Sequence, residues 1–245
     1  MTLHIDTDRG KIPPYAIMIM LSFAAGIGSM FILNVKNGVR KRIAGYLSLL
    51  APFMSIFFGL LLTYISTLGK GMGLSSIGGL AGMFAAVVTI ALIGKDRREF
   101  RIMLTSCTLV IPLMYSVSKL GCLFAGCCHG IAYHGPFCIE YTGKRTGDIC
   151  VFPVQLAETL LFFAIFIIGL VLFMKKSRHT ELFIMIASVI GKGGLDFLRV
   201  SHTGKVISFN QILCLFIAAA GIFALKFLNR RKAEYSCLYN KKSLQ

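Results

Sequence analysis

Four ionisable side chains interrupt otherwise apolar segments of this 245-residue chain. They are Lys119, Glu158, Lys192 and Asp196. Charged groups inside apolar segments are costly, so they usually pair with one another or belong to a site. Two ammonium groups at one depth would suit the phosphate of a lipid headgroup, which lysine binds as a point charge. The first hypothesis is therefore chemistry at a phospholipid headgroup. In the alternative, Lys192 only pairs with Asp196, and Lys119 extends toward the membrane surface.

The elements that must position these residues are apolar runs of membrane-spanning length. The apolar share is 56%, above the roughly 45–50% of soluble domains. Seven runs come close to the roughly 20 residues that cross a bilayer, although glycines and serines open the third. They are Tyr15–Val35, Ala44–Ser66, Met72–Ile93, Ile102–Lys119, Val154–Met174, Leu182–Leu198 and Phe209–Leu228. We predict an all-α, polytopic membrane protein with seven transmembrane helices.

The positions of the basic residues predict the orientation of these helices. Lys and Arg number 26 against 10 acids, a net charge of +16. Most of the basic residues follow the first, third, fifth and seventh runs, as Arg40, Arg97, Lys175 and Arg230 do. This bias predicts an external N-terminus and a cytoplasmic C-terminus. The basic clusters then face anionic lipid of the inner leaflet, and a nucleic-acid partner is not expected.

We divide the chain into three parts. Residues 1–12 form a short external segment, 13–230 a single seven-helix domain, and 231–245 a basic cytoplasmic tail. The first apolar run is too long for the core of a cleaved signal peptide, so we predict a retained helix. In this topology the four ionisable residues and Gln211 all lie at the external ends of their helices.

Glycines and cysteines at the external side each allow two interpretations. Gly78 and Gly82 are spaced for close helix packing, which the segment alone favours, but the same glycines suit a backbone that bends around a headgroup. The cysteines are Cys122, Cys127, Cys128, Cys138 and Cys150. Adjacent Cys127 and Cys128 lack the C-x-x-C spacing of zinc ligands, so we predict neither metal nor cofactor. A disulfide between a cysteine of the fourth helix and Cys138 or Cys150 is allowed, and a thiol or quinone redox protein is the alternative.

Five short motifs around these residues resemble those of the prolipoprotein diacylglyceryl transferase family, in the same order. K-L-G-C-L-F-A-G-C-C-H-G at Lys119–Gly130 resembles R-x-G-N/C-F-x-x-G with its later glycine, and S-I-G-G-L-A-G at Ser76–Gly82 resembles H-G-G-L-x-G. P-V-Q-L-A-E at Pro153–Glu158 resembles P-S-Q-L-Y-E. G-K-G-G-L-D-F-L-R at Gly191–Arg199 resembles R-x-x-x-E-F-x-R, and N-Q-I-L at Asn210–Leu213 resembles G-Q-I-L. Each motif is weak, and the ordered set over residues 13 to 230 is jointly specific.

The resemblance implies a reaction and a set of site residues. Members of the family move the diacylglyceryl group of phosphatidylglycerol to the lipobox cysteine thiol of preprolipoproteins, forming a thioether and releasing glycerol phosphate. It implies Lys119, Lys192 and Asp196 as catalytic residues, in which the lysines bind phosphate and Asp196 orients Lys192. The implied substrate-binding residues are Gly78, Gly79, Gly121, Cys122, Gly126, Gly130, Gln155, Glu158, Arg199 and Gln211. Expected partners are phosphatidylglycerol or another outer-leaflet phospholipid and the signal peptide of a preprolipoprotein, at a bacterial plasma membrane.

The chain departs from the family pattern at three positions that bear on catalysis. Ile77 stands where the family has the histidine proposed as the base for the thiol, and Lys119 and Lys192 stand where it has arginines. Asp196 and His129 are then the candidate bases. The alternatives to the family reaction are a paralogue with a different acceptor and a non-catalytic or thiol-redox membrane protein that keeps the fold.

Overall fold

The computed structural model describes residues 3–6, 14–69, 75–142, 149–177 and 179–200. Six helices and three short strands lie in these ranges. The helices are α1 (Pro14–Lys36), α2 (Lys41–Ser66), α3 (Ser76–Gly94), α4 (Arg97–Phe124), α5 (Val154–Met174) and α6 (Thr180–Asp196). The strands are β1 (Leu3–Asp6), β2 (Ile139–Thr142) and β3 (Ile149–Val151).

The helices confirm the prediction of a helical membrane protein in its coarser form. Among the described residues, α1 to α5 are long and apolar enough to cross a membrane. Helix α6 covers most of the sixth predicted run but has only 17 residues. The seventh predicted run, Phe209–Leu228, lies outside the described residues. The number of seven helices and the direction of the termini therefore stay predictions.

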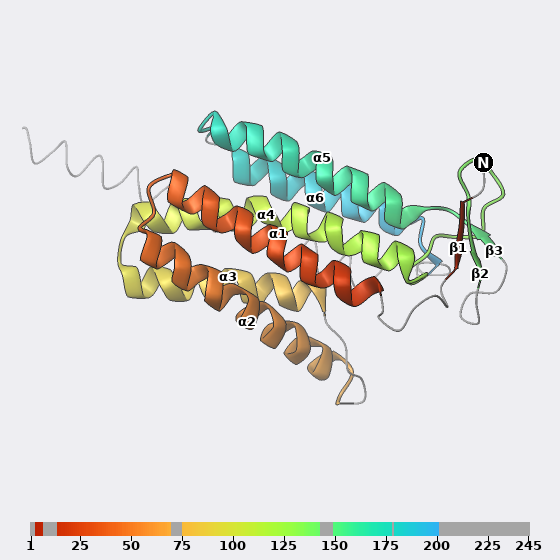
Figure 1. Ribbon diagram of the computed structural model, residues 1–245, viewed down its shortest axis with the longest axis horizontal. Coiled ribbons are helices and arrows are strands. Elements are labelled where there is room, and N and C mark those ends of the chain that lie inside the picture. Colours follow the sequence, from red (N-terminus) through yellow and green to blue (C-terminus); the bar gives the residue numbers. More distant parts are fainter. Residues whose placement is uncertain (1–2, 7–13, 70–74, 143–148, 178, 201–245) are drawn as a thin grey trace, which may run out of the picture.

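Helix α4 is the central element of the bundle. It packs against α1, α3, α5 and α6, while α2 packs mainly against α3 (Figure 1). It is also longer than the predicted run at both ends. The Asp96 side chain caps its start by accepting hydrogen bonds from the backbone N–H groups of Arg98 and Glu99, at 2.8 and 3.3 Å. Such a cap satisfies donors that have no partner within the helix, so the helix begins in a polar stretch.

A small sheet, which the all-α prediction did not include, lies at one end of the bundle. Its order is β1-β2-β3, with β1 parallel to β2 and β2 antiparallel to β3. It lies at the end where α4 stops and α5 starts (Figure 1). A disulfide joins Cys138, directly before β2, to Cys150 in β3. The sequence expectation had named a helix-four cysteine as one partner, and the structure instead pairs the two loop cysteines.

Glycines let α2 and α3 approach closely. A Cβ atom at Gly78 would meet the Phe58 carbonyl oxygen, and one at Gly82 would meet the Met54 carbonyl oxygen. Both obstacles are backbone atoms of α2, which move only if the helix moves. The structure therefore shows the packing role that the spacing of these glycines favours.

We expect Gly82→Ala to destabilise the bundle by about 1–3 kcal/mol, the usual cost of overpacking. The measurement is thermal unfolding of the purified protein in detergent. The matched control is Gly28→Ala in α1, because in the described part of the chain no atom outside its own turn of α1 lies within 4 Å of a Cβ built there. Equal melting temperatures for the two variants would contradict the close α2–α3 contact.

Candidate active site

A single buried carboxylate joins three cations from different segments of the chain. Glu158 of α5 is fully buried. Its Oε2 lies 3.1 Å from Lys119 Nζ of α4, and its Oε1 accepts a hydrogen bond from Lys192 Nζ of α6 at 2.9 Å. Arg199, just beyond α6, donates from Nη2 to both carboxylate oxygens at 2.6 Å. The structure thus brings together three of the residues that the sequence placed at one depth, Lys119, Glu158 and Lys192, and adds Arg199.

Tyr115 is a member of this group that sequence reasoning missed. Its hydroxyl donates to Glu158 Oε1 at 3.1 Å. The ammonium groups of Lys119 and Lys192 lie 5.0 and 5.3 Å from the centre of its ring, within the range of cation–π attraction. A signal was present, because Tyr115 precedes Lys119 by four residues and so shares its face of α4.

Asp196 has an ion-pair contact with Arg199. Its Oδ1 lies 3.7 Å from Nε of Arg199, and the ion pair of Lys192 is with Glu158. Asp196 therefore helps to hold Arg199, while Glu158 holds Lys192. The expectation that Asp196 orients Lys192 rested on their spacing of four residues along one helix. The structure shows a long-range partner for Lys192 on α5, and the action of Asp196 on Lys192 stays a prediction.

The charges of this group favour an anion as ligand. Three cations, Lys119, Lys192 and Arg199, surround two carboxylates, Glu158 and Asp196. All five side chains are buried or nearly so, which weakens screening by water. Within the described residues, Arg199 Nε is buried and has no hydrogen-bond acceptor. A phosphate oxygen would both match the surplus positive charge and supply an acceptor.

Comparison with known proteins decides the family. The family model for prolipoprotein diacylglyceryl transferase matches residues 4–227. The chain belongs to this family.

Two curated relatives resemble part of the chain. The phosphatidylglycerol–prolipoprotein diacylglyceryl transferase of Clostridium tetani (strain Massachusetts / E88) is 27% identical over 133 residues, which are 51% of this chain and 53% of the relative. Phosphatidylglycerol–prolipoprotein diacylglyceryl transferase 2 of Clostridium perfringens (strain 13 / Type A) is 29% identical over 138 residues, 51% of this chain and 52% of the relative. The chain thus spans about half the length of the curated relatives it matches.

The glycines that match the transferase family's signature have packing or turn roles. A Cβ at Gly121 would lie 2.8 Å from the Met18 Cβ of α1. Gly126 turns the chain after α4 with φ +65°, a region that suits glycine. A Cβ at Gly130 would lie 2.5 Å from the Phe152 carbonyl oxygen, so this loop passes close to the start of α5. Their assignment to a headgroup pocket stays a prediction.

Other residues predicted from the transferase motifs lie apart from Glu158 or outside the described residues. Gly78 and Gly79 are buried against α2, where a Cβ at Gly79 would lie 3.0 Å from Ser55 Oγ. Ile77, at the family's histidine position, lies in α3 beside them. Gln211 lies outside the described residues. His129, one of the candidate bases, follows Cys128 and has a buried Nδ1 without a hydrogen-bond partner among the described residues.

Gln155 of the family motif P-V-Q-L-A-E holds the loop after α4 in place. It is fully buried, and its Nε2 donates to the Cys127 carbonyl oxygen at 2.9 Å and to the Tyr141 hydroxyl oxygen at 3.2 Å. Burial raises the pKa of Tyr141 to about 12, so its hydroxyl stays protonated at neutral pH. Gln155 therefore acts on the loop that carries the cysteines.

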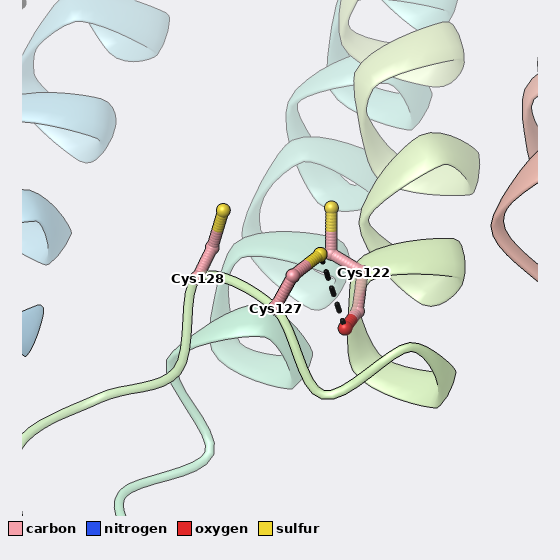
Figure 2. Close-up of side chains that lie close together, drawn as sticks. All are labelled: Cys122, Cys127 and Cys128. Atoms are coloured by element: carbon pink, nitrogen blue, oxygen red, sulfur yellow. Dashed lines mark hydrogen bonds between the residues drawn. The ribbon is translucent and has the colours of Figure 1, made fainter. Parts of the chain in front are cut away.

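The cysteines of the transferase signature come together in the structure. The sulfur atoms of Cys122, Cys127 and Cys128 all lie within 4.8 Å of one another. Cys122 is buried in the last turn of α4, and the other two lie in the loop that follows (Figure 2). The C-x-x-C spacing rule does not describe this group, because the turn after α4 brings all three sulfur atoms together. The absence of a metal stays a prediction.

Proposed function

We propose that this protein transfers the diacylglyceryl group of phosphatidylglycerol to the lipobox cysteine thiol of preprolipoproteins in a bacterial plasma membrane. The observation that carries this proposal is the buried carboxylate of Glu158 surrounded by Lys119, Lys192 and Arg199. Family membership supports the reaction class, and the names of the relatives support the two substrates. The proposed protein has seven transmembrane helices with an external N-terminus, so that this group faces the outer leaflet.

The reaction divides into one bond made and one bond broken. The acceptor thiol releases its proton to solvent, and its sulfur attacks the glyceryl carbon that carries the phosphate. A C–S bond forms while the C–O bond breaks, and the electron pair leaves with the phosphate oxygen of glycerol phosphate. Lys119, Lys192 and Arg199 would neutralise the leaving phosphate, an electrostatic form of transition-state stabilisation. Glu158 would hold the three cations at one point before the lipid arrives.

The test is complementation of a bacterial strain depleted of its own diacylglyceryl transferase. We expect expression of this protein to restore the diacylglyceryl modification of a reporter lipoprotein, measured by mass spectrometry of its N-terminal peptide. A Lys192→Met variant, checked for membrane insertion, serves as the inactive control. If the inserted parent protein leaves the reporter unmodified, the proposed acceptor is wrong. Modification of a different thiol peptide in the same experiment would identify the paralogue with another acceptor.

A further inference from the structure

Three thiol groups form a compact cluster beside the cations of the proposed active site. The sulfur atoms of Cys122, Cys127 and Cys128 lie within 4.8 Å of one another, and none of the three is in a disulfide. Their side chains point to the same side of the loop that follows α4 (Figure 2). The three residues differ in solvent exposure: Cys122 is buried, Cys127 is half-buried and Cys128 is exposed. One side of the cluster therefore faces the protein and the other is open.

The local backbone holds this arrangement. The N–H group of Cys127 donates to the Cys122 carbonyl oxygen at 3.2 Å, which closes the turn after α4. Gln155 donates to the carbonyl oxygen of Cys127 from α5. Cys128 has φ +57°, a left-handed conformation that is unfavourable for a residue with a Cβ. The loop that carries Cys127 and Cys128 is therefore held by hydrogen bonds to the end of α4 and to Gln155 of α5.

The cluster matches the ligand set of a zinc ion with an open position. Zinc binds thiolate at about 2.3 Å in tetrahedral geometry, so neighbouring sulfurs of such a site lie about 3.8 Å apart. The sulfurs reach this spacing with movements of about 1 Å or less. Catalytic zinc sites have three protein ligands and leave the fourth position to water or substrate. Among the described residues, this group offers three ligands and one open side.

We propose that Cys122, Cys127 and Cys128 bind a zinc ion whose fourth position takes the acceptor thiol of the transfer reaction. This inference rests on the proposed function, because it assigns the step that prepares the thiol. The thiol binds zinc in place of water and releases its proton to solvent. The bound thiolate would then attack the glyceryl carbon, the C–O bond to phosphate would break with release of glycerol phosphate, and the thioether would leave the metal to water. Zinc changes neither oxidation state nor electron count, so no oxidant or reductant is needed.

The position of the cluster fits this role. Cys122 lies three residues after Lys119 on α4, and therefore one turn from a cation that would bind the lipid phosphate. Gly130, two residues after Cys128, forms a β-bridge with Arg199. A zinc ion held by thiolates carries net negative charge, which the nearby cations would balance. A metal that deprotonates the thiol outright would also replace the base that the family places at the position of Ile77.

The first test measures metal binding by the full-length protein in detergent, without any transfer assay. We expect one zinc ion per chain, and thiolate-to-metal charge-transfer absorption when cobalt replaces zinc. Each of three variants should bind zinc more weakly: Cys122→Ser, Cys127→Ser and Cys128→Ser. The loss of affinity should exceed about 10–100-fold, which is the effect of mutating a residue that only supports a metal ligand. Cys107→Ala is the matched control, because Cys107 is an unpaired thiol of α4 outside the cluster. Absence of bound zinc, or a disulfide within the cluster of the untreated protein, would overturn the proposal.

The second test examines the fourth position. A lipobox cysteine peptide added to the cobalt form should change its charge-transfer spectrum, and the same peptide with serine should not. An unchanged spectrum overturns the thiol coordination. The two proposals fail separately: undiminished lipidation by metal-free protein removes the zinc and keeps the transferase, whereas coordination of the peptide thiol without lipidation keeps the zinc and removes the transferase.

Discussion

Glu158→Gln is expected to lower the free energy of unfolding by about 3–5 kcal/mol, the range for removing one partner of a buried ion pair. The substitution keeps the size of the side chain and removes its charge. Lys119, Lys192 and Arg199 would then remain close together in a buried place, where their mutual repulsion is weakly screened. Thermal and denaturant unfolding of the purified protein in detergent measure this effect.

The control for Glu158→Gln is Glu181→Gln in α6. Glu181 is also buried, but its carboxylate accepts a hydrogen bond from the Thr105 hydroxyl at 2.6 Å, a neutral partner. The expected loss of stability is therefore smaller than that of Glu158→Gln. A phosphate or phosphatidylglycerol additive should restore part of the stability of the Glu158 variant, because an anion can replace the missing carboxylate. Equal stability of the two variants would contradict the central role of Glu158.

Lys192→Met is expected to lower the rate of diacylglyceryl transfer by about 10²–10³-fold, the effect of losing one group that stabilises transition-state charge. The folded state should survive, because Glu158 keeps Lys119 and Arg199 as partners. Lys192→Arg should retain most of the activity, since arginine keeps the charge and adds a second donor for phosphate. The measurement is kcat for a lipobox peptide with phosphatidylglycerol vesicles, together with a melting curve for each variant.

Lys175→Met is the matched control for this experiment. Lys175 is an exposed residue at the C-terminal end of α5, the end away from Glu158. The same loss of charge at this position should leave kcat unchanged. Full activity of Lys192→Met would remove the electrostatic role that we assign to the cations.

The long elements of the fold could be predicted from the apolar runs. Helix α5 covers the predicted Val154–Met174 to the residue, because it starts directly after Pro153, is apolar without a break from Leu160 on, and ends at basic residues. Helix α4 extends beyond its run, because the Asp96 cap lets a polar stretch begin the helix. The sheet was not predicted, since β3 has three residues and β2 has four. Strands of that length show no alternation, and the partner of β1 lies more than a hundred residues away.

The charged members of the candidate site could be predicted, but Tyr115 and the pairing among the charges could not. Depth in the membrane selected Lys119, Glu158, Lys192 and Asp196 from the sequence. Which acid meets which cation depends on the rotation of α4, α5 and α6 about their axes, which is set by side-chain packing along their whole length. The approach of Cys128 to Cys122 was missed for a different reason. It depends on left-handed backbone at Gly126 and Cys128, which a rule based on ligand spacing does not include.

The contact between α5 and α6 also bears on how the chain enters the bilayer during synthesis. Helix α6 has 17 residues and carries Lys192, so its own hydropathy is a weak signal for insertion. When α6 leaves the ribosome, α4 and α5 have already been made. Glu158 then offers Lys192 a counter-ion that lipid cannot supply. We expect the ion pair between Lys192 and Glu158 to retain α6 in the membrane. The carboxylate of Glu158 would then serve twice, in the insertion of α6 during synthesis and in anion binding by the mature protein.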